Sequence, residues 1–295
     1  MKQVWGLDEN IWIMTEKLTI SLMVASHTPL CQHWMMDLGL LGKVALVTGS
    51  YRGTGSGIAR VLAAEGAEVV VHGFEEGQAD WLADELGSPV RAVWGDICTD
   101  EGAEAVASQC GPVDVLVNNY GVAVGGTWGD DGTDVWVDAY NRNVLSAVRM
   151  TRLMVPAMME RGWGRIVLVS TVGATRPGDR IPGYYAAKGA LPAMTVSLAR
   201  ELAGTGVTVN CVSPGAIATS ELVEMWTRQA EREGRSTDWD DIERHVTTVQ
   251  MPTLTGRIAT VSDVGELVAF VCSDRARQIH GAHLRIDGGA ADVVT

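Results

Sequence analysis

The sequence predicts an α/β domain in which a parallel sheet of seven strands carries helices on both faces, the doubly wound arrangement. Short apolar runs alternate with segments of helical periodicity along the chain. A glycine-rich turn stands between the first apolar run and the first helical segment, and no break in composition marks a second domain. The 295 residues, 46% of them hydrophobic, are enough for one large core.

The strands are expected where short, continuous apolar runs occur, because strands covered by helices on both faces have no polar face. Between them, apolar residues at helical spacing, such as Ile58, Val61 and Leu62 before Gly66, indicate the connecting helices. Further helices are expected over about 77–86 and 101–109. The expected strands cover residues 44–47, 68–71, 90–94, 113–117, 165–169, 207–212 and 283–286.

Residues 1 to about 36 are expected to be an N-terminal extension, either disordered or loosely docked, or the product of an over-long translation start. Its apolar run at 18–25 is interrupted by Thr19 and Ser21 and is too short to span a bilayer. From Met36 onward the sequence has the character of a domain start, so we expect the domain to cover 37–295.

A polar, charged insertion is expected at about 220–256. It contains two amphipathic helical patterns, one at Leu222, Met225 and Trp226 and one at 239–249. Two interpretations stay open for it. It is either a lid over a substrate cleft, or a hairpin of helices that packs on the body or on a neighbouring subunit.

The formal net charge of −13 gives no general attraction to nucleic acid or to an anionic membrane, so neither is expected as a partner. An anionic cofactor can still be held locally by backbone N–H groups and one arginine. The five cysteines are scattered without a CxxC pair, a pattern typical of free thiols in a reducing cytosol, and the six histidines form no cluster. We therefore expect a cytoplasmic protein without a metal site.

The turn at 48–55, TGSYRGTG, follows a strand and opens a helix, which is where a glycine-rich loop binds phosphate. Its glycines let the backbone approach a pyrophosphate, and the helix N-terminus supplies oriented N–H groups. A glycine cluster alone is more typical of a structural turn without a ligand. The candidate cofactor contacts in it are Gly49, Ser50, Tyr51, Arg52, Gly53, Thr54 and Gly55.

Tyr184 and Lys188 stand one helical turn apart, and Thr171 precedes the tyrosine by thirteen residues. A free phenol, with a pKa of about 10, is a poor base at neutral pH, and a lysine on the same helix face favours the phenolate. The Thr171 hydroxyl can donate to a carbonyl oxygen. Ser170 is expected to point to the opposite face of its strand. Tyr185, three residues from Lys188, is the alternative tyrosine.

In this order the motifs resemble those of the short-chain dehydrogenases/reductases, in particular the 3-oxoacyl-acyl-carrier-protein reductase group. The resemblance runs from about Leu38 to Gly289. It implies a Rossmann-like fold, an NAD(P)-dependent oxidoreductase acting on a small carbonyl or alcohol substrate, and a homotetramer or homodimer. It rests on 48–55, Asp96-Ile97, Asn118-Asn119, Asn143, Tyr184 to Lys188, Asn210, Pro214-Gly215 through Thr219, and Asp287-Gly288-Gly289.

The resemblance also implies roles for individual residues. Tyr184 is the general acid or base, in the register that excludes Tyr185, and Thr171 takes the place of the usual serine. Asn143 holds a water of the proton relay, and Lys188 binds the nicotinamide ribose. Asp96 and Ile97 are expected to contact the adenine. The other implied cofactor contacts are Asn119, Gly121, Pro214, Gly215, Ile217 and Thr219.

The sequence favours NADP(H) over NAD(H). No acidic residue stands at the end of the second strand, His72-Gly73-Phe74, to take a ribose 2′-hydroxyl. Arg52 is well placed for a 2′-phosphate. Tyr120 replaces the usual alanine, and Phe74 a common phosphate ligand, so a catalytically weak NAD(P)-binding regulator is an alternative. A partner-binding domain without a cofactor is a weaker one.

Overall fold

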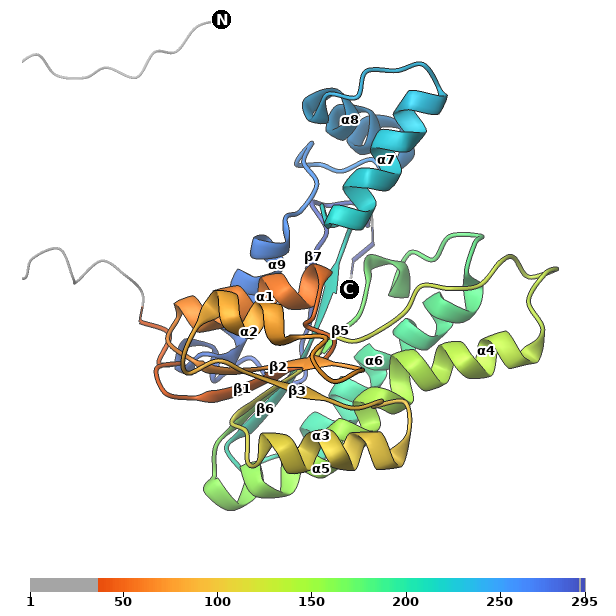
Figure 1. Cartoon of the computed structure of the whole chain (residues 1–295). Helices are drawn as coiled ribbons and strands as arrows, with labels where there is room; N and C mark the ends of the chain where they lie inside the picture. Colours follow the sequence, from red (N-terminus) through yellow and green to blue (C-terminus); the bar gives the residue numbers. More distant parts are fainter. Residues whose placement is uncertain (1–36, 292, 295) are drawn as a thin grey trace, which may run out of the picture. The chain divides into compact units, whose positions relative to one another are not determined.

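The computed structural model describes residues 37–291, 293 and 294, so the expectation for residues 1 to 36 lies outside the described chain. The described residues form a sheet of seven strands in the order β3-β2-β1-β4-β5-β6-β7, and every neighbouring pair is parallel. The predicted fold class is confirmed (Figure 1). The strands are β1 Val44–Val47, β2 Glu68–Gly73, β3 Arg91–Trp94, β4 Val115–Asn118, β5 Gly164–Val169, β6 Val207–Pro214 and β7 His283–Ile286.

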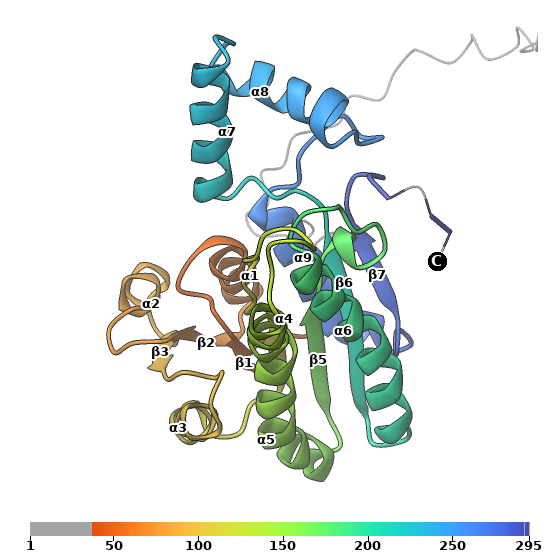
Figure 2. The ribbon, with the colours of Figure 1, turned by 90° about the vertical axis from the view of Figure 1, so that its right-hand side faces the viewer.

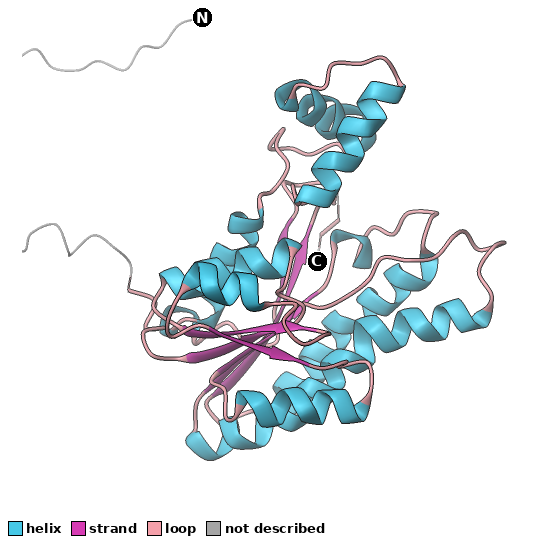
Figure 3. Ribbon diagram, viewed as in Figure 1, coloured by secondary structure: helices cyan, strands magenta, loops and turns pink. Residues whose placement is uncertain are grey.

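Helices cover both faces of the sheet, as Figure 3 shows. Alternate residues of β1 point to opposite faces, so Ala45 and Val47 join the core with α1, α2 and α9, while Leu46 joins the core with α3 and α5. The α1–α9 helices are Gly53–Ala64, Asp80–Leu86, Asp100–Cys110, Thr133–Tyr140, Ser146–Arg161, Pro182–Glu201, Ser220–Arg232, Trp239–His245 and Val261–Cys272. None of the described helices is long and apolar enough to cross a membrane.

The order of the strands determines where a ligand can bind. The chain runs outward from β1 through β2 to β3, then returns across β1 to β4 and continues in the other direction. The connections after β1 and β4 therefore leave the sheet on opposite faces, and a crevice opens between them at the carboxyl ends of the strands. The glycine-rich turn lies at this point.

The insertion folds as two helices, α7 and α8, followed by a π-helical stretch at Val246–Gln250. Both views place it beyond the carboxyl ends of the strands (Figures 1 and 2). It has a small core of its own, made of Trp226, Ala230, Ile242, Val246 and Ile258. Val249, which the helical pattern placed with Ile242 and Val246, is 65% exposed, because the π-helical stretch changes the phase of the helix after His245.

His72 is buried in β2 and ties the glycine-rich turn to the sheet. Its Nδ1 accepts from the Gly49 N–H at 2.9 Å, so Nε2 carries the proton and donates to the Gly95 carbonyl at 2.9 Å. Its backbone N–H donates to Ser50 Oγ at 2.8 Å. Burial lowers the pKa of His72 to about 4, against the smaller opposing effects of the Gly95 hydrogen bond and the Asp96 charge. The neutral imidazole is thus a structural part of the turn.

This histidine should make the protein less stable in acid. Its pKa is 6.5 unfolded and about 4 folded, so its contribution to the free energy of unfolding is constant above pH 6.5. It falls between pH 6.5 and 4, where the unfolded chain binds the extra proton, by roughly 3 kcal/mol at most. Urea denaturation across this range measures the fall. His72→Gln, which cannot titrate, should show a smaller fall; equal falls in both proteins would contradict the role.

Candidate functional site

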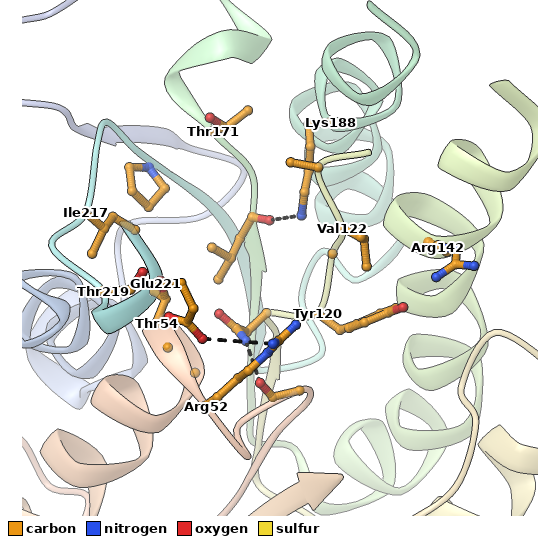
Figure 4. Close-up of a pocket in the computed structure, with 18 of the residues that line it drawn as sticks. Arg52, Thr54, Tyr120, Val122, Arg142, Thr171, Lys188, Ile217, Thr219 and Glu221 are labelled. Atoms are coloured by element: carbon orange, nitrogen blue, oxygen red, sulfur yellow. Dashed lines mark hydrogen bonds and ion pairs between the residues drawn. The ribbon is translucent and has the colours of Figure 1, made fainter. Parts of the chain in front are cut away.

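A cavity of about 700 Å³ lies at the carboxyl edge of the sheet, in the crevice that the strand order creates. It runs between the glycine-rich turn, the ends of β4, β5 and β6, and the first residues of α6 and α7. Figure 4 shows Thr171 and Lys188 on one side of it and Arg52 and Tyr120 on another. Most of the predicted site residues line it: Gly49, Tyr51, Arg52, Gly53, Thr54, Gly55, Asn119, Gly121, Thr171, Tyr184, Lys188, Pro214, Gly215, Ile217 and Thr219.

Four predicted residues are not among those that line the cavity in the described chain. Ser50 is fully buried and accepts the His72 N–H instead. Ile97 belongs to the core, and Asp96 Oδ1 accepts from the Cys98 N–H at 2.9 Å. Asn143 lies behind the cavity wall. These side chains therefore shape the elements around the cavity without facing into it.

The glycine-rich turn is held by hydrogen bonds to the loop after β4. Thr48 Oγ1 accepts from the backbone N–H groups of Asn119 and Tyr120, each at 3.1 Å, and Asn119 Nδ2 donates to the Thr48 carbonyl at 2.9 Å. A Cβ on Gly55 would lie 2.5 Å from Asn119 Nδ2 and 2.7 Å from the Gly49 carbonyl oxygen. Only glycine fits there, and the contact draws the loop after β4 close to the turn.

The N-terminus of α1 is suited to a phosphate. Arg52, at the N-cap, makes no side-chain capping hydrogen bond within the described structure, so it leaves the first N–H groups of the helix for another acceptor. Its guanidinium lies 3.9 Å from the Glu221 carboxylate in the first turn of α7, and both side chains are largely exposed. The uncapped helix end and the glycine cradle fit the diphosphate of a dinucleotide cofactor, and Arg52 adds a positive charge at the same end of the cavity.

Thr171 and Tyr184 meet at the other side of the cavity, where Thr171 follows β5 and Tyr184 is in the first turn of α6. Burial raises the pKa of Tyr184 to about 12; the neighbouring Tyr185 raises it further, and a hydrogen bond with Thr171 lowers it. The hydroxyl of Ser170 donates to the Lys188 carbonyl at 2.8 Å, so it is engaged with α6. Thr171 is thus the hydroxyl available beside the tyrosine.

Lys188 is buried, and its Nζ donates to the Val169 carbonyl at 2.8 Å. Burial lowers the pKa of Lys188 to about 8. Burial, Tyr185 and Thr171 set the pKa of Tyr184 in this arrangement, whereas the spacing predicts an effect of Lys188. A Cβ on Gly121 would lie 2.5 Å from both Lys188 Nζ and Asn143 Oδ1, so glycine is required where these side chains approach the loop.

Asn143 lies in a π-helical stretch, Asn141–Leu145, that joins α4 to α5. Its Oδ1 accepts from the Val122 N–H at 2.9 Å, and its Nδ2 donates to the carbonyls of Val122 and Ala139 at 3.1 and 2.8 Å. The side chain ties the helix to the loop after β4. Its direct role is therefore to position Gly121 and Val122.

The cavity also contains residues that the sequence did not indicate as contacts. Phe74 and Tyr120 face it, although their identities in the sequence marked them only as departures from the family pattern. Arg142 and Glu221 come from helices whose orientation the local sequence does not specify. The further lining residues are Gln78, Val122, Ala123, Val169 and Ser170.

Comparisons with known proteins agree with this geometry. A family model described as enoyl-(acyl carrier protein) reductase matches residues 49–291. The D-beta-hydroxybutyrate dehydrogenase of Cupriavidus necator is 34% identical over 259 residues, which are 85% of this chain and 98% of that protein. The 3-oxoacyl-[acyl-carrier-protein] reductase of Escherichia coli is 34% identical over 252 residues, 84% of this chain and 97% of that protein.

Among solved structures, the L-sorbose reductase of Gluconobacter frateurii, complexed with NADPH and L-sorbose, matches with a TM-score of 0.80 and 32% identity. The match covers 88% of this chain and all of that one. A 3-oxoacyl (acyl-carrier-protein) reductase of Agrobacterium tumefaciens with NADP bound matches with a TM-score of 0.77 and 28% identity over 88% of this chain and 98% of that one. The chain belongs to the short-chain dehydrogenase/reductase family and is an oxidoreductase that acts on carbonyl and alcohol groups with a nicotinamide cofactor.

Proposed function

We propose that the chain is an NADP(H)-dependent oxidoreductase in which Tyr184 exchanges the proton with a carbonyl or secondary alcohol substrate. The observation that carries this proposal is the single cavity that joins Thr171, Tyr184 and Lys188 to the uncapped end of α1. A dinucleotide held by its diphosphate at α1 spans such a cavity. When bound, the nicotinamide supplies or accepts the hydride.

The protonation state of Tyr184 suits carbonyl reduction. With its pKa raised to about 12, the phenol stays neutral at physiological pH and has a proton to give. The Thr171 hydroxyl, hydrogen-bonded beside it, donates to the oxygen on which negative charge develops. Lys188, which is buried next to Gly121, orients the nicotinamide ribose. Oxidation requires the phenolate, which this environment makes costly.

The preference for NADP(H) rests on Arg52. The end of β2 carries Gly73 and Phe74, neither of which can accept from a 2′-hydroxyl with its side chain, and Arg52 lines the same part of the cavity. The two similar structures that contain NADPH or NADP support this choice for the present chain. Glu221 balances the arginine charge, so a 2′-phosphate competes with a carboxylate for it.

The α7–α8 insertion is proposed to cover the substrate. Thr219 and Glu221, at the start of α7, line the cavity, and Thr219 Oγ1 caps the helix by accepting from the Leu222 N–H at 3.4 Å. The helix that begins at the cavity is therefore the element we propose as the cover of the substrate. We also propose a homodimer or homotetramer, supported by the exposed apolar side chains of Val137 on α4 and Leu153 on α5.

The alternative is a catalytically weak NAD(P)-binding regulator on the same fold. Tyr120 favours it, because its bulky ring lies in the cavity where the family pattern has a small side chain. The two functions differ in turnover: the enzyme reduces carbonyl compounds with NADPH, whereas the regulator binds the dinucleotide and reduces none.

Replacing Tyr184 with phenylalanine should lower kcat/KM by about 10²–10⁴-fold, because the proton donor is lost. The NADPH dissociation constant and the melting temperature should change little. Tyr185→Phe is the matched control, since it removes the neighbouring hydroxyl, and it should keep turnover. Steady-state reduction of a ketone that the protein accepts measures both; full activity of Tyr184→Phe would refute the assignment.

The raised pKa of Tyr184 also predicts how the two directions depend on pH. The rate constant for reduction should stay flat between about pH 5 and 7, below the pKa of about 8 at which Lys188 loses its proton, because the phenol remains protonated there. The rate constant for oxidation should rise about tenfold per pH unit over the same range, since it follows the phenolate fraction. Profiles of kcat/KM in both directions test this. A plateau in oxidation near neutral pH would contradict it.

Calorimetric titration tests the cofactor choice. We expect NADPH to bind more tightly than NADH, and Arg52→Ala to weaken NADPH by about tenfold or more while NADH changes little, because the guanidinium makes charge-assisted bonds only to the 2′-phosphate. Arg52→Lys keeps the charge and should lose less. Preference for NADH would overturn the choice of NADP(H) and leave the enzyme; binding of neither would overturn the function.

A further inference from the structure

Two aromatic rings face each other at the end of the cavity beyond the glycine-rich turn. Phe74 follows β2 and Tyr120 follows β4, so they come from the strands on either side of β1. Their ring centroids are 4.6 Å apart and their planes are tilted by 52°. Both rings line the cavity. We propose that Phe74 and Tyr120 form an aromatic clamp that opens to hold the adenine base of the cofactor between them. This inference rests on the proposed dinucleotide binding.

Along the cavity, the clamp lies where the adenine base of the proposed cofactor is expected. The nicotinamide end is fixed by Thr171 and Tyr184, and the diphosphate lies at the start of α1, so the adenosine must lie on the far side of the turn. Figure 4 shows Tyr120 there, near Arg142 and away from Thr171. A flat base meets aromatic faces and a guanidinium at this end, and both are surfaces on which bases stack.

Tyr120 also takes the space through which the expected adenine contacts would act. Asp96 and Ile97 are not among the residues that line the cavity in the described chain. The Tyr120 hydroxyl accepts from the Cys98 thiol at 3.8 Å, so the tyrosine side chain reaches the turn that contains Asp96 and Ile97. The Tyr120 ring therefore lines the cavity at the place where the family pattern implies the Asp96 carboxylate.

The clamp must open to work. A base between two parallel rings needs two contact distances of about 3.5 Å each, or about 7 Å between the rings. At 4.6 Å the rings instead cover each other, and they must part by roughly 2–3 Å to admit the base. The closed pair covers part of each apolar ring, although both rings still line the cavity.

The backbones on either side are fixed, and the Tyr120 hydroxyl contacts the Cys98 thiol and the Arg142 guanidinium. The Tyr120 N–H donates to Thr48 Oγ1 at 3.1 Å, and the Phe74 N–H donates to Gln78 Oε1 at 2.5 Å. The Tyr120 hydroxyl meets a thiol, a weak donor, at the limit of hydrogen-bond distance. A Cβ on Gly49 would lie 3.2 Å from Tyr120 Cβ and 3.3 Å from Tyr120 Cδ2, so the bare glycine lets the Tyr120 side chain lie directly against the turn.

Calorimetric titration of the full chain tests the clamp with NADPH, NADH and reduced nicotinamide mononucleotide, which lacks adenosine. Tyr120→Leu keeps an apolar side chain without an aromatic face and should weaken both dinucleotides by about tenfold or more. The Tyr120→Leu variant should bind the mononucleotide with the same affinity as the unaltered protein. Tyr120→Phe, the matched control, should bind all three normally, and Phe74→Leu should behave like Tyr120→Leu.

The outcomes separate the clamp from the proposed function. An equal loss for NADPH and NADH supports the clamp, because both contain adenine, whereas Arg52→Ala affects NADPH alone. Unchanged binding of the dinucleotides by Tyr120→Leu overturns the clamp. Tighter binding also overturns it, because it shows that the Tyr120 ring blocks the site. Failure of the unaltered protein to bind either dinucleotide overturns the proposed function. Equal melting temperatures for Tyr120→Leu and Tyr120→Phe exclude misfolding as the cause of a loss; where they differ, Phe74→Leu decides.

Discussion

The hydrogen bonds that fix the glycine-rich turn are the constraint on which the site depends. The Gly49 N–H donates to His72, and the Thr48 hydroxyl accepts hydrogen bonds from two backbone N–H groups of the loop after β4. These partners come from β2 and β4, the two neighbours of β1 in the sheet. The first N–H groups of α1 have no capping side chain among the described residues, and the cavity lies in front of them. Loss of either anchor would move both walls of the cavity.

Burial shifts the pKa values of Tyr184 and Lys188, at the side of the cavity opposite the glycine-rich turn. It raises the pKa of Tyr184 and lowers the pKa of Lys188, so each group is pushed toward its neutral form by the same loss of solvent. Spacing along the helix suggested that the lysine charge would stabilise a phenolate. In the structure the ammonium donates to the Val169 carbonyl, and burial raises the pKa of the Tyr184 phenol.

The sheet and most of the cavity were predictable because they follow from local patterns. Apolar runs locate strands, and a turn between a strand and a helix locates a phosphate site. The residues that do not line the cavity have another origin. Ser50 and Asn143 are bound by groups distant in sequence, the His72 and Val122 N–H groups, whereas Asp96 accepts from the nearby Cys98 N–H. Arg142 lies beside the cavity through the arrangement of whole helices, which no short motif encodes.

The Arg52–Glu221 pair bears on how an acidic chain can bind an anionic ligand. With a net charge of −13, long-range attraction does not bring phosphate to the site, so binding depends on local donors. The arginine that serves as one of them is already matched by a carboxylate on α7. This exposed pair is weak, and a phosphate with two negative charges can replace the single charge of Glu221. On the proposed binding of NADP(H), occupation of the phosphate site would therefore change the contacts of α7 through the single side chain of Glu221.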